Sequence, residues 1–214
     1  MSRPGAKVPP EAPSRRRHDL PSVLEVAVAV FTERGYDGTS MEDLSRATGL
    51  SKSSLYHHID SKEQLLRLAL ERAVDPLFGV LDEPGANQGP AIDRLSHVVR
   101  REVEVLADQL PYVTLLLRVH GNTGTERWAL ERRREFDRRV AEIVVAAVAE
   151  GYLRDDVDPF LVTRLLFGMI NSFVGWYRPD SASRRGRHGS RSRPPNELAD
   201  ALLRVVFDGL RKRS

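Results

Sequence analysis

Residues 27–66 read AVAVFTERGYDGTSMEDLSRATGLSKSSLYHHIDSKEQLL, and this stretch decides the fold. Just ahead of it and into its first turns, apolar side chains recur at spacings of three and four residues from Val23 to Phe31. Such spacing places them on one face of a helix, and Gly35 is a natural terminator for that helix. The pattern predicts an amphipathic helix from about residue 20 to Gly35.

Two short helices are predicted directly after this one. Thr39 stands three residues before Glu42, which is the spacing of a capping box, and Gly49 follows after little more than two turns. Ser51 then caps a very short helix that runs to about His58. A longer helix followed by two short ones with a glycine between them is the arrangement of a helix-turn-helix.

The second short helix carries the residue types that a recognition helix uses in the major groove. It combines a cation, two small hydroxyl side chains and two rings that donate hydrogen bonds and touch thymine methyl groups: Lys52, Ser53, Ser54, Tyr56 and His57. Lys62 is predicted in the first turn of the next helix, where backbone N–H groups and the helix dipole favour a phosphate. The alternative is that this short capped helix is an ordinary corner of a helical bundle.

Residues 27–66 resemble the DNA-binding domain of the tetracycline-repressor (TetR) family. The resemblance rests on features whose spacing is preserved: Gly35-Tyr36, Thr39-Ser40, Ala47, Gly49, Ser51, Leu55-Tyr56-His57 and Ser61-Lys62-Glu63. It implies a set of side chains that face DNA: Thr39, Ser40, Lys52, Ser53, Ser54, Tyr56, His57 and Lys62. Residues 36–62 carry three basic and four acidic side chains, so we expect affinity to come from placed contacts and from two heads acting together.

The composition of the 214 residues limits the class of protein. Hydrophobic residues make up 41% of the chain, enough for a core, and the absence of cysteine excludes disulfides, thiolate metal sites and thiol nucleophiles. The basic residues near the start are followed by no apolar stretch of the kind found in secretory signals. We also expect no apolar run of the roughly 18 residues that span a bilayer. A cytoplasmic protein is therefore predicted.

The net charge of +3 is unevenly distributed. Residues 1–18 and 180–195 each carry +4 and are rich in Pro, Gly and Ser, which leaves −5 for the rest of the chain. We expect a disordered basic tail over 1–18 and a disordered basic loop over 180–195, which either approach phosphates or only aid solubility. The predicted domains are a DNA-binding head, residues 19–62, and an effector-binding and dimerisation body, residues 63–214.

Helical periodicity continues through the body, so the predicted fold class is all-α, with about nine helices in total. A long helix is expected after Ser61, and residues 84–90, PGANQGP, are predicted to form a loop. Further helices are predicted from about residue 92, from Pro111, over residues 126–150, after the capping pair Asp158-Pro159, and over residues 196–212.

A dimer interface is predicted on the last two helices. Residues 160–177 are apolar on nearly every side, so one side of this helix fits the body and the other fits a second copy of the chain. The last two helices of TetR-family proteins form the dimer. The predicted interface residues are Phe160, Arg164, Gly168, Gly175, Ala201, Leu202, Val205, Val206 and Gly209. The alternative is a helix that is simply central to a monomeric bundle.

The TetR resemblance also implies a mainly apolar effector pocket inside the body. Candidate lining residues are Tyr112, Leu116, His120, Trp128, Phe136, Phe167 and Asn171, the alternative being that these form plain core. Residues 125–179 are similar to TetR-type regulators of fatty-acid, phenylacetate and sterol degradation, several of which respond to acyl-coenzyme A thioesters. Arg127 and the arginines at 132–134 either meet phosphates at the pocket mouth or form a solvated helix face with Glu131 and Glu135.

These observations predict a DNA-binding transcriptional regulator: a homodimer on a near-palindromic double-stranded site, and a repressor that a small apolar or acyl-CoA-type effector releases. The effector would move the helix that joins head to body, so that the recognition helices no longer match one turn of DNA, roughly 34 Å. No cofactor, metal site or membrane contact is predicted. Catalytic motifs such as HExxH, GxSxG and GxGxxG are absent from the sequence, which disfavours an enzyme. The alternative is a ligand-independent architectural or partner-binding helical protein.

Overall fold

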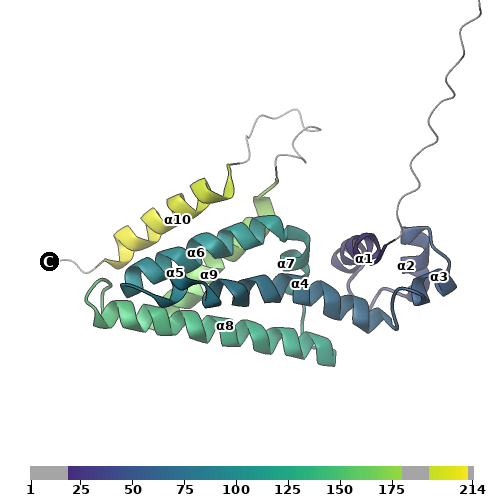
Figure 1. The fold of residues 1–214 in the computed structure, drawn as a ribbon, viewed down its shortest axis with the longest axis horizontal. Coiled ribbons are helices and arrows are strands. Elements are labelled where there is room, and N and C mark those ends of the chain that lie inside the picture. Colours follow the sequence, from purple (N-terminus) through teal and green to yellow (C-terminus); the bar gives the residue numbers. More distant parts are fainter. Residues whose placement is uncertain (1–18, 180–192, 212–214) are drawn as a thin grey trace, which may run out of the picture.

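The computed structural model describes residues 19–179 and 193–211, so the predicted tail 1–18 and nearly all of the predicted loop 180–195 lie outside the described residues. Over these two ranges the chain forms ten α-helices and no β-strand, which confirms the all-α prediction. A small group, α1–α3, lies at one end of the molecule, and a larger bundle, α4–α10, makes up the remainder (Figure 1).

The head contains α1 (Leu20–Arg34), α2 (Met41–Thr48) and α3 (Lys52–Tyr56). Gly35 and Gly49 end the first two helices as predicted, with φ of 80° and 73°, a region that side chains with a Cβ rarely adopt. Phe31, Leu44 and Leu55, one from each helix, are buried, and each has at most 1% of its surface exposed. These three side chains form the small core that fixes α3 against α1 and α2.

The start of α2 differs from the prediction by one position. The Ser40 hydroxyl accepts from the Asp43 N–H at 3.1 Å, and the Asp43 carboxylate accepts from the Ser40 N–H at 2.9 Å, which completes a capping box. Thr39 is 2% exposed, and its hydroxyl donates to the Gly35 carbonyl at 2.7 Å. The predicted pair of Thr39 and Glu42 was therefore wrong, because Thr39 closes the turn before the helix.

The body contains α4 (Lys62–Asp82), α5 (Pro84–Asn87), α6 (Ala91–Asp108), α7 (Leu110–Leu116), α8 (Gly124–Ala149), α9 (Pro159–Trp176) and α10 (Pro195–Leu210). The short α5 lies in the segment predicted as a loop, and it accounts for the additional helix. Asp158 caps α9 as predicted, since its carboxylate accepts from the Leu161 N–H at 2.8 Å.

The body helices pack around α4, α6 and α8. These three helices contact one another, α9 packs along α8, and α10 lies along the side of α6 that faces away from α8 (Figure 1). Leu70, Leu95, Val140 and Ile170, from four different helices, are each fully buried in this core. The body therefore has a closely packed interior to which each of its long helices contributes.

Head and body meet along α4 and at the turn between α7 and α8. The first residues of α4 pack in the head, and its second half lies in the body (Figure 1). The Thr125 hydroxyl donates to the Glu63 carboxylate at 2.9 Å, and the Asn122 amide donates to the Asp37 carboxylate at 2.8 Å. The head is therefore held to the body by a continuous helix and by polar contacts beside it.

Candidate functional site

The short helix α3 presents an exposed face made of residues predicted to contact DNA. Tyr56 is 52% exposed, and Lys52, Ser53 and His57 are exposed as well. Leu55 is fully buried on the opposite side. A helix of five residues is not stable in isolation, so the packing of Leu55 is what keeps these exposed side chains in a fixed orientation.

Hydroxyl groups organise the start of α3. The Ser51 Oγ lies 2.9 Å from the Oγ atoms of both Ser53 and Ser54 and accepts from the Ser54 N–H at 3.1 Å. Lys52 Nζ lies 3.4 Å from the Glu42 carboxylate, and both side chains are exposed. An exposed pair of this kind contributes little free energy, so Lys52 remains available to a phosphate.

Lys62 has a different place from the one predicted. Its ammonium donates to the carbonyls of Tyr36 at 2.9 Å and Thr39 at 2.7 Å, and it lies 4.1 Å from the centroid of the Tyr36 ring. Lys62 therefore ties the turn before α2 to the first turn of α4. Thr39 is buried and Lys62 is half-buried, and both make contacts within the head. Their contact with DNA stays a prediction, whereas Ser40 is exposed at the start of α2.

A cavity of about 490 Å³ lies inside the body and is lined by α4, α6, α7, α8 and α9. Phe136 stacks on Phe167 with ring centroids 5.6 Å apart, and Phe78 meets Phe136 edge-on at 5.9 Å. The remaining apolar lining consists of Val74, Leu77, Leu106, Val113, Leu116, Leu117 and Phe160. A cavity of this size and character suits a small, largely apolar molecule.

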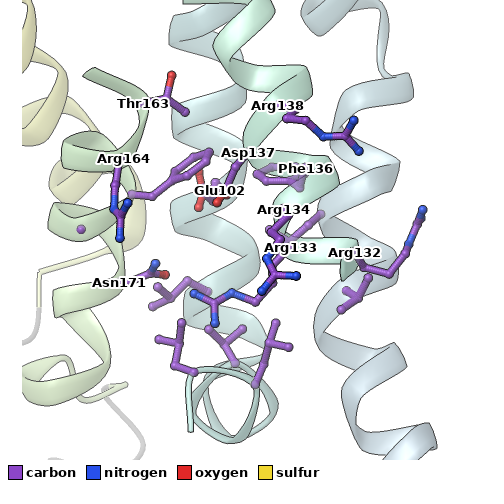
Figure 2. A pocket seen from close by; sticks show the side chains of 18 of the residues that line it. Glu102, Arg132, Arg133, Arg134, Phe136, Asp137, Arg138, Thr163, Arg164 and Asn171 are labelled. Atoms are coloured by element: carbon purple, nitrogen blue, oxygen red, sulfur yellow. The ribbon is translucent and has the colours of Figure 1, made fainter. Parts of the chain in front are cut away.

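Arginines from α8 and α9 also line this cavity: Arg132, Arg133, Arg134, Arg138 and Arg164. In Figure 2, Arg133, Arg134 and Arg164 lie around the same opening. Guanidinium groups donate in a planar fork that matches phosphate and carboxylate oxygens. The cavity therefore combines an apolar interior with donors suited to an anion.

Two of the predicted mouth arginines have other partners. Arg127 donates to the carbonyls of Gly121 and Asn122 at 3.2 and 3.3 Å, in the turn before α8, and it does not line the cavity. Arg132 lines the cavity but lies over the Phe78 ring, 3.5 Å from its centroid. The anion-binding character of the cavity therefore rests on other arginines of α8 and α9.

Glu102 of α6 brings a carboxyl group into the apolar lining, and the sequence prediction missed it. Its side chain is 6% exposed, and Oε2 has no hydrogen-bond partner among the described residues. Burial and the neighbouring charge of Asp137 raise the pKa of Glu102 well above its usual value. Burial also raises the pKa of Asp137, while Arg133 and Arg164 act to lower it. Figure 2 shows the two carboxyl groups next to each other.

Four of the predicted pocket residues line the cavity: Leu116, Phe136, Phe167 and Asn171. The other three lie elsewhere. The Tyr112 hydroxyl accepts from Arg72 at 3.2 Å, and the Trp128 ring is covered by Arg67 with 3.4 Å between guanidinium and centroid. His120 is exposed just after α7. Helical spacing identified apolar positions correctly but could not assign them to one side of α4 or the other.

The predicted interface residues fall into two groups. Phe160, Arg164, Gly168, Gly175, Val205 and Gly209 are exposed, which leaves them accessible to a second copy. Leu202 and Val206 are 7% and 6% exposed because they pack within their own chain, and Ala201 is half-buried. For Leu202 and Val206 the prediction as dimer contacts is corrected. Phe160, Arg164 and Gly168 also line the cavity.

Large apolar side chains that the prediction did not name are exposed on α9: Leu161, Leu165, Met169 and Trp176. Leu165 is 58% exposed and Trp176 is 55% exposed, and a patch of large exposed apolar side chains is typical of an interaction surface. Helix α9 is also long and apolar enough to cross a membrane, contrary to our expectation for the chain. Among the described helices it alone passes that test, which core and interface helices of soluble proteins also pass.

A helix-turn-helix head with an exposed recognition face, joined to a helical body with an internal cavity, defines a DNA-binding transcriptional regulator. Residues 23–69 match the family model of bacterial regulatory proteins of the tetR family, and residues 88–210 match the tetracyclin repressor-like C-terminal domain. The chain belongs to the TetR family of transcriptional regulators, whose members bind DNA as dimers, and it is not an enzyme.

Relatives and solved structures agree with this assignment. The HTH-type transcriptional repressor KstR2 of Rhodococcus jostii is 30% identical over 200 residues, which cover 92% of each chain. A TetR-family regulator from Streptomyces coelicolor A3 is 63% identical, with a TM-score of 0.80 over 89% of this chain and 91% of that one. AibR, solved with isovaleryl coenzyme A and operator DNA, is 25% identical, with a TM-score of 0.70 over 88% of this chain and 97% of that one.

Proposed function

We propose that this regulator is a cytoplasmic repressor that binds a near-palindromic operator as a homodimer. The DNA contacts are assigned to α3, the residue that follows it and the start of α2: Ser40, Lys52, Ser53, Ser54, Tyr56 and His57, of which all but the half-buried Ser54 are exposed. The two-fold interface is assigned to the exposed apolar side chains of α9 together with Val205 of α10. Dimerisation covers these side chains and sets the separation of the two recognition helices.

The effector class in this proposal is an acyl-CoA thioester, with its acyl chain among the phenylalanines and its phosphates on the arginines. The observation that carries this assignment is the joint lining of one cavity by Phe136, Phe167, Arg133 and Arg164. A thioester of coenzyme A is apolar at one end and anionic at the other, which matches this arrangement. The complex of AibR with isovaleryl coenzyme A and operator DNA supports it, because that protein shares the fold.

Release of DNA follows from the place of α4. Val74, Leu77 and Phe78 of this helix line the cavity, and the same helix begins in the head at Lys62. A ligand that fits better when these side chains are displaced shifts α4 and, with it, the head. The ligand changes operator affinity only to the extent that it binds the two arrangements differently.

The proposal is tested by gel-shift titration of the purified dimer on the DNA upstream of its own gene, with isovaleryl-CoA and octanoyl-CoA as probes. We expect release by at least one thioester and none by coenzyme A alone. Loss of one charge-assisted contact is worth about 1.5–3 kcal/mol, so the double variant R133M/R164M should need roughly tenfold more thioester or higher. Arg127→Met is the matched control, because Arg127 lies outside the cavity.

Two outcomes would contradict the acyl-CoA assignment. Equal sensitivity of the wild type and the R133M/R164M variant would remove the arginines from ligand binding. Indifference to every thioester, with operator binding intact, would instead favour the ligand-independent alternative.

A further inference from the structure

Glu102 is the polar group in the cavity whose presence neither packing nor the assigned phosphate contacts explain. It lies on α6 in the lining of the cavity, next to Asp137, and its Oε2 atom is buried without a hydrogen-bond partner among the described residues. A buried polar atom left without a partner costs about 1–3 kcal/mol. Glu102 therefore lines the cavity and has an unmade hydrogen bond, which a ligand that fills the cavity could satisfy.

The neighbours of Glu102 determine its protonation state. Asp137 on α8 is the charged group that acts on it most directly, and a second negative charge beside it is unfavourable in a buried site. Arg133 and Arg164 act on Asp137. The arginines oppose only part of the rise in the pKa of Asp137, and the pKa of Glu102 is raised well above its usual value, first by burial and then by the charge of Asp137, which favours the neutral form of Glu102. A neutral carboxyl group has an O–H to donate.

The surroundings also decide which ligand group would meet this carboxyl. A cationic ligand group would have to enter beside Arg133, Arg134 and Arg164, which repel it. The Thr163 hydroxyl, another polar group of the lining, donates to the Pro159 carbonyl of its own helix at 2.8 Å. Glu102 Oε2 has no hydrogen bond to the neighbouring Asp137 carboxyl group, so the O–H of a neutral Glu102 can donate to an acceptor oxygen on the ligand.

We propose that Glu102 is the specificity-determining residue of the effector cavity and that the effector carries a carbonyl-type acceptor oxygen on its buried, otherwise apolar part. This inference deepens the proposed function, since it concerns the same cavity. The contact between Glu102 and the acceptor oxygen is separate from the contact between the arginines and the phosphates. The preferred effector is thus an oxygenated acyl group rather than a plain hydrocarbon chain.

The test uses two ring compounds of the same shape, cyclohexanone and methylenecyclohexane. The first has an acceptor oxygen (C=O) where the second has a CH₂ group (C=CH₂). Their dissociation constants for the full-length dimer are measured by NMR titration for the wild type, Glu102→Gln and Glu102→Leu. Glutamine keeps a neutral donor, whereas leucine fills the position without one. We expect cyclohexanone to bind about 5- to 10-fold more tightly than methylenecyclohexane to the wild type and to Glu102→Gln, and the two rings to bind equally to Glu102→Leu.

Persistence of the cyclohexanone preference in Glu102→Leu would overturn the proposal, as would the absence of a preference in the wild type. Failure of both rings to bind would overturn it too. The Glu102→Leu variant removes a buried polar group, so we expect it to fold. Because these probes contain no coenzyme A, the result is separate from the operator-release experiment. A cyclohexanone preference without release by thioesters would leave Glu102 assigned and the acyl-CoA class wrong, and the reverse result would leave the acyl-CoA class standing alone.

Discussion

The charge of Lys62 has several partners inside the head. Two carbonyl groups, those of Tyr36 and Thr39, receive their donors from this single ammonium, and the Tyr36 ring lies against it. A point charge on a flexible stem is suited to such a position, since it satisfies several acceptors that are not coplanar. DNA binding therefore depends on Lys62 through the orientation of α2 and α4.

Adjacent hydroxyl residues show where sequence reasoning ends. Thr39 with Glu42 and Ser40 with Asp43 both have capping-box spacing, so the local pattern cannot choose between them. The choice is made by tertiary contacts: the Thr39 side chain is buried against the Gly35 carbonyl, which leaves Ser40 to cap the helix. The sequence shows Glu102 as a charge in an apolar stripe, because Val98 and Leu106 lie four residues to either side of it. The pattern alone could not show that Glu102 lines a cavity, because that depends on the packing of other helices against α6.

The buried carboxyl of Glu102 predicts a pH-dependent stability. Its pKa is raised in the folded chain, so above pH about 4.5, its ordinary value, the unfolded chain releases a proton that the folded chain retains. The free energy of unfolding of the wild type therefore falls as pH rises, by up to about 1.4 kcal/mol per pH unit, until the raised pKa is passed. Glu102→Gln lacks this dependence.

Urea unfolding of the wild type and Glu102→Gln at pH about 5, 6.5 and 8 measures this effect. We expect the stability of Glu102→Gln relative to the wild type to increase with pH. Glu142→Gln, on the exposed side of α8, is the matched control. Parallel stability curves for the wild type and Glu102→Gln would show that Glu102 ionises normally in the folded protein.

Among the elements, α9 has two functions on opposite sides. Thr163 and Phe167 face the body and line the cavity, whereas Leu165 and Trp176 are exposed. The sequence predicted a helix that is apolar all round and therefore covered all round, and that is what periodicity can establish. Which residues face the second copy depended on the packing of α9 against α8, which no local pattern contains.

Gly175 tests whether a second copy approaches α9 closely. A Cβ at this position meets nothing within 4 Å in the single chain, so on helix propensity alone Gly175→Ala should stabilise the fold by about 0.5–1 kcal/mol. If a partner backbone packs against the glycine, the added methyl group disturbs that packing at a cost of about 1–3 kcal/mol. We expect the dimer dissociation constant to rise about tenfold, as measured by sedimentation velocity.

Gly79→Ala is the matched control, because Gly79 of α4 is also exposed and a Cβ there also meets nothing within 4 Å. It should leave the dimer dissociation constant unchanged. An equally unchanged value for Gly175→Ala would place the interface away from this end of α9.

At the scale of the whole molecule, coupling between cavity and operator needs a head that follows the body. Helix α4 is one connection, but Pro76 within it removes one N–H from its hydrogen-bond ladder, which weakens the helix as a rigid lever. The segment from α7 to α8 supplies a second connection through Asn122, Thr125 and Arg118, whose guanidinium donates to the Thr32 carbonyl at 2.5 Å. The sequence predicts the first connection, the long helix after Ser61. It could not predict the second, because the partners lie more than sixty residues apart.

The double variant N122A/T125V weakens this second connection. It removes the side-chain hydrogen bonds to Asp37 and Glu63, and it leaves in place α4, the recognition helix and the contact of Arg118 with Thr32. Together, these two hydrogen bonds should stabilise the attachment of the head by about 1–2 kcal/mol. Their loss should therefore accelerate hydrogen exchange in α1–α3 about 5- to 30-fold. A less firmly held head loses more freedom on binding, so operator affinity should fall in the same direction. Asn196→Ala, at the exposed start of α10, is the control. Exchange in α1–α3 that matches the wild type would mean that these two side-chain hydrogen bonds do not hold the head, which would leave α4 and the Arg118 contact to position it.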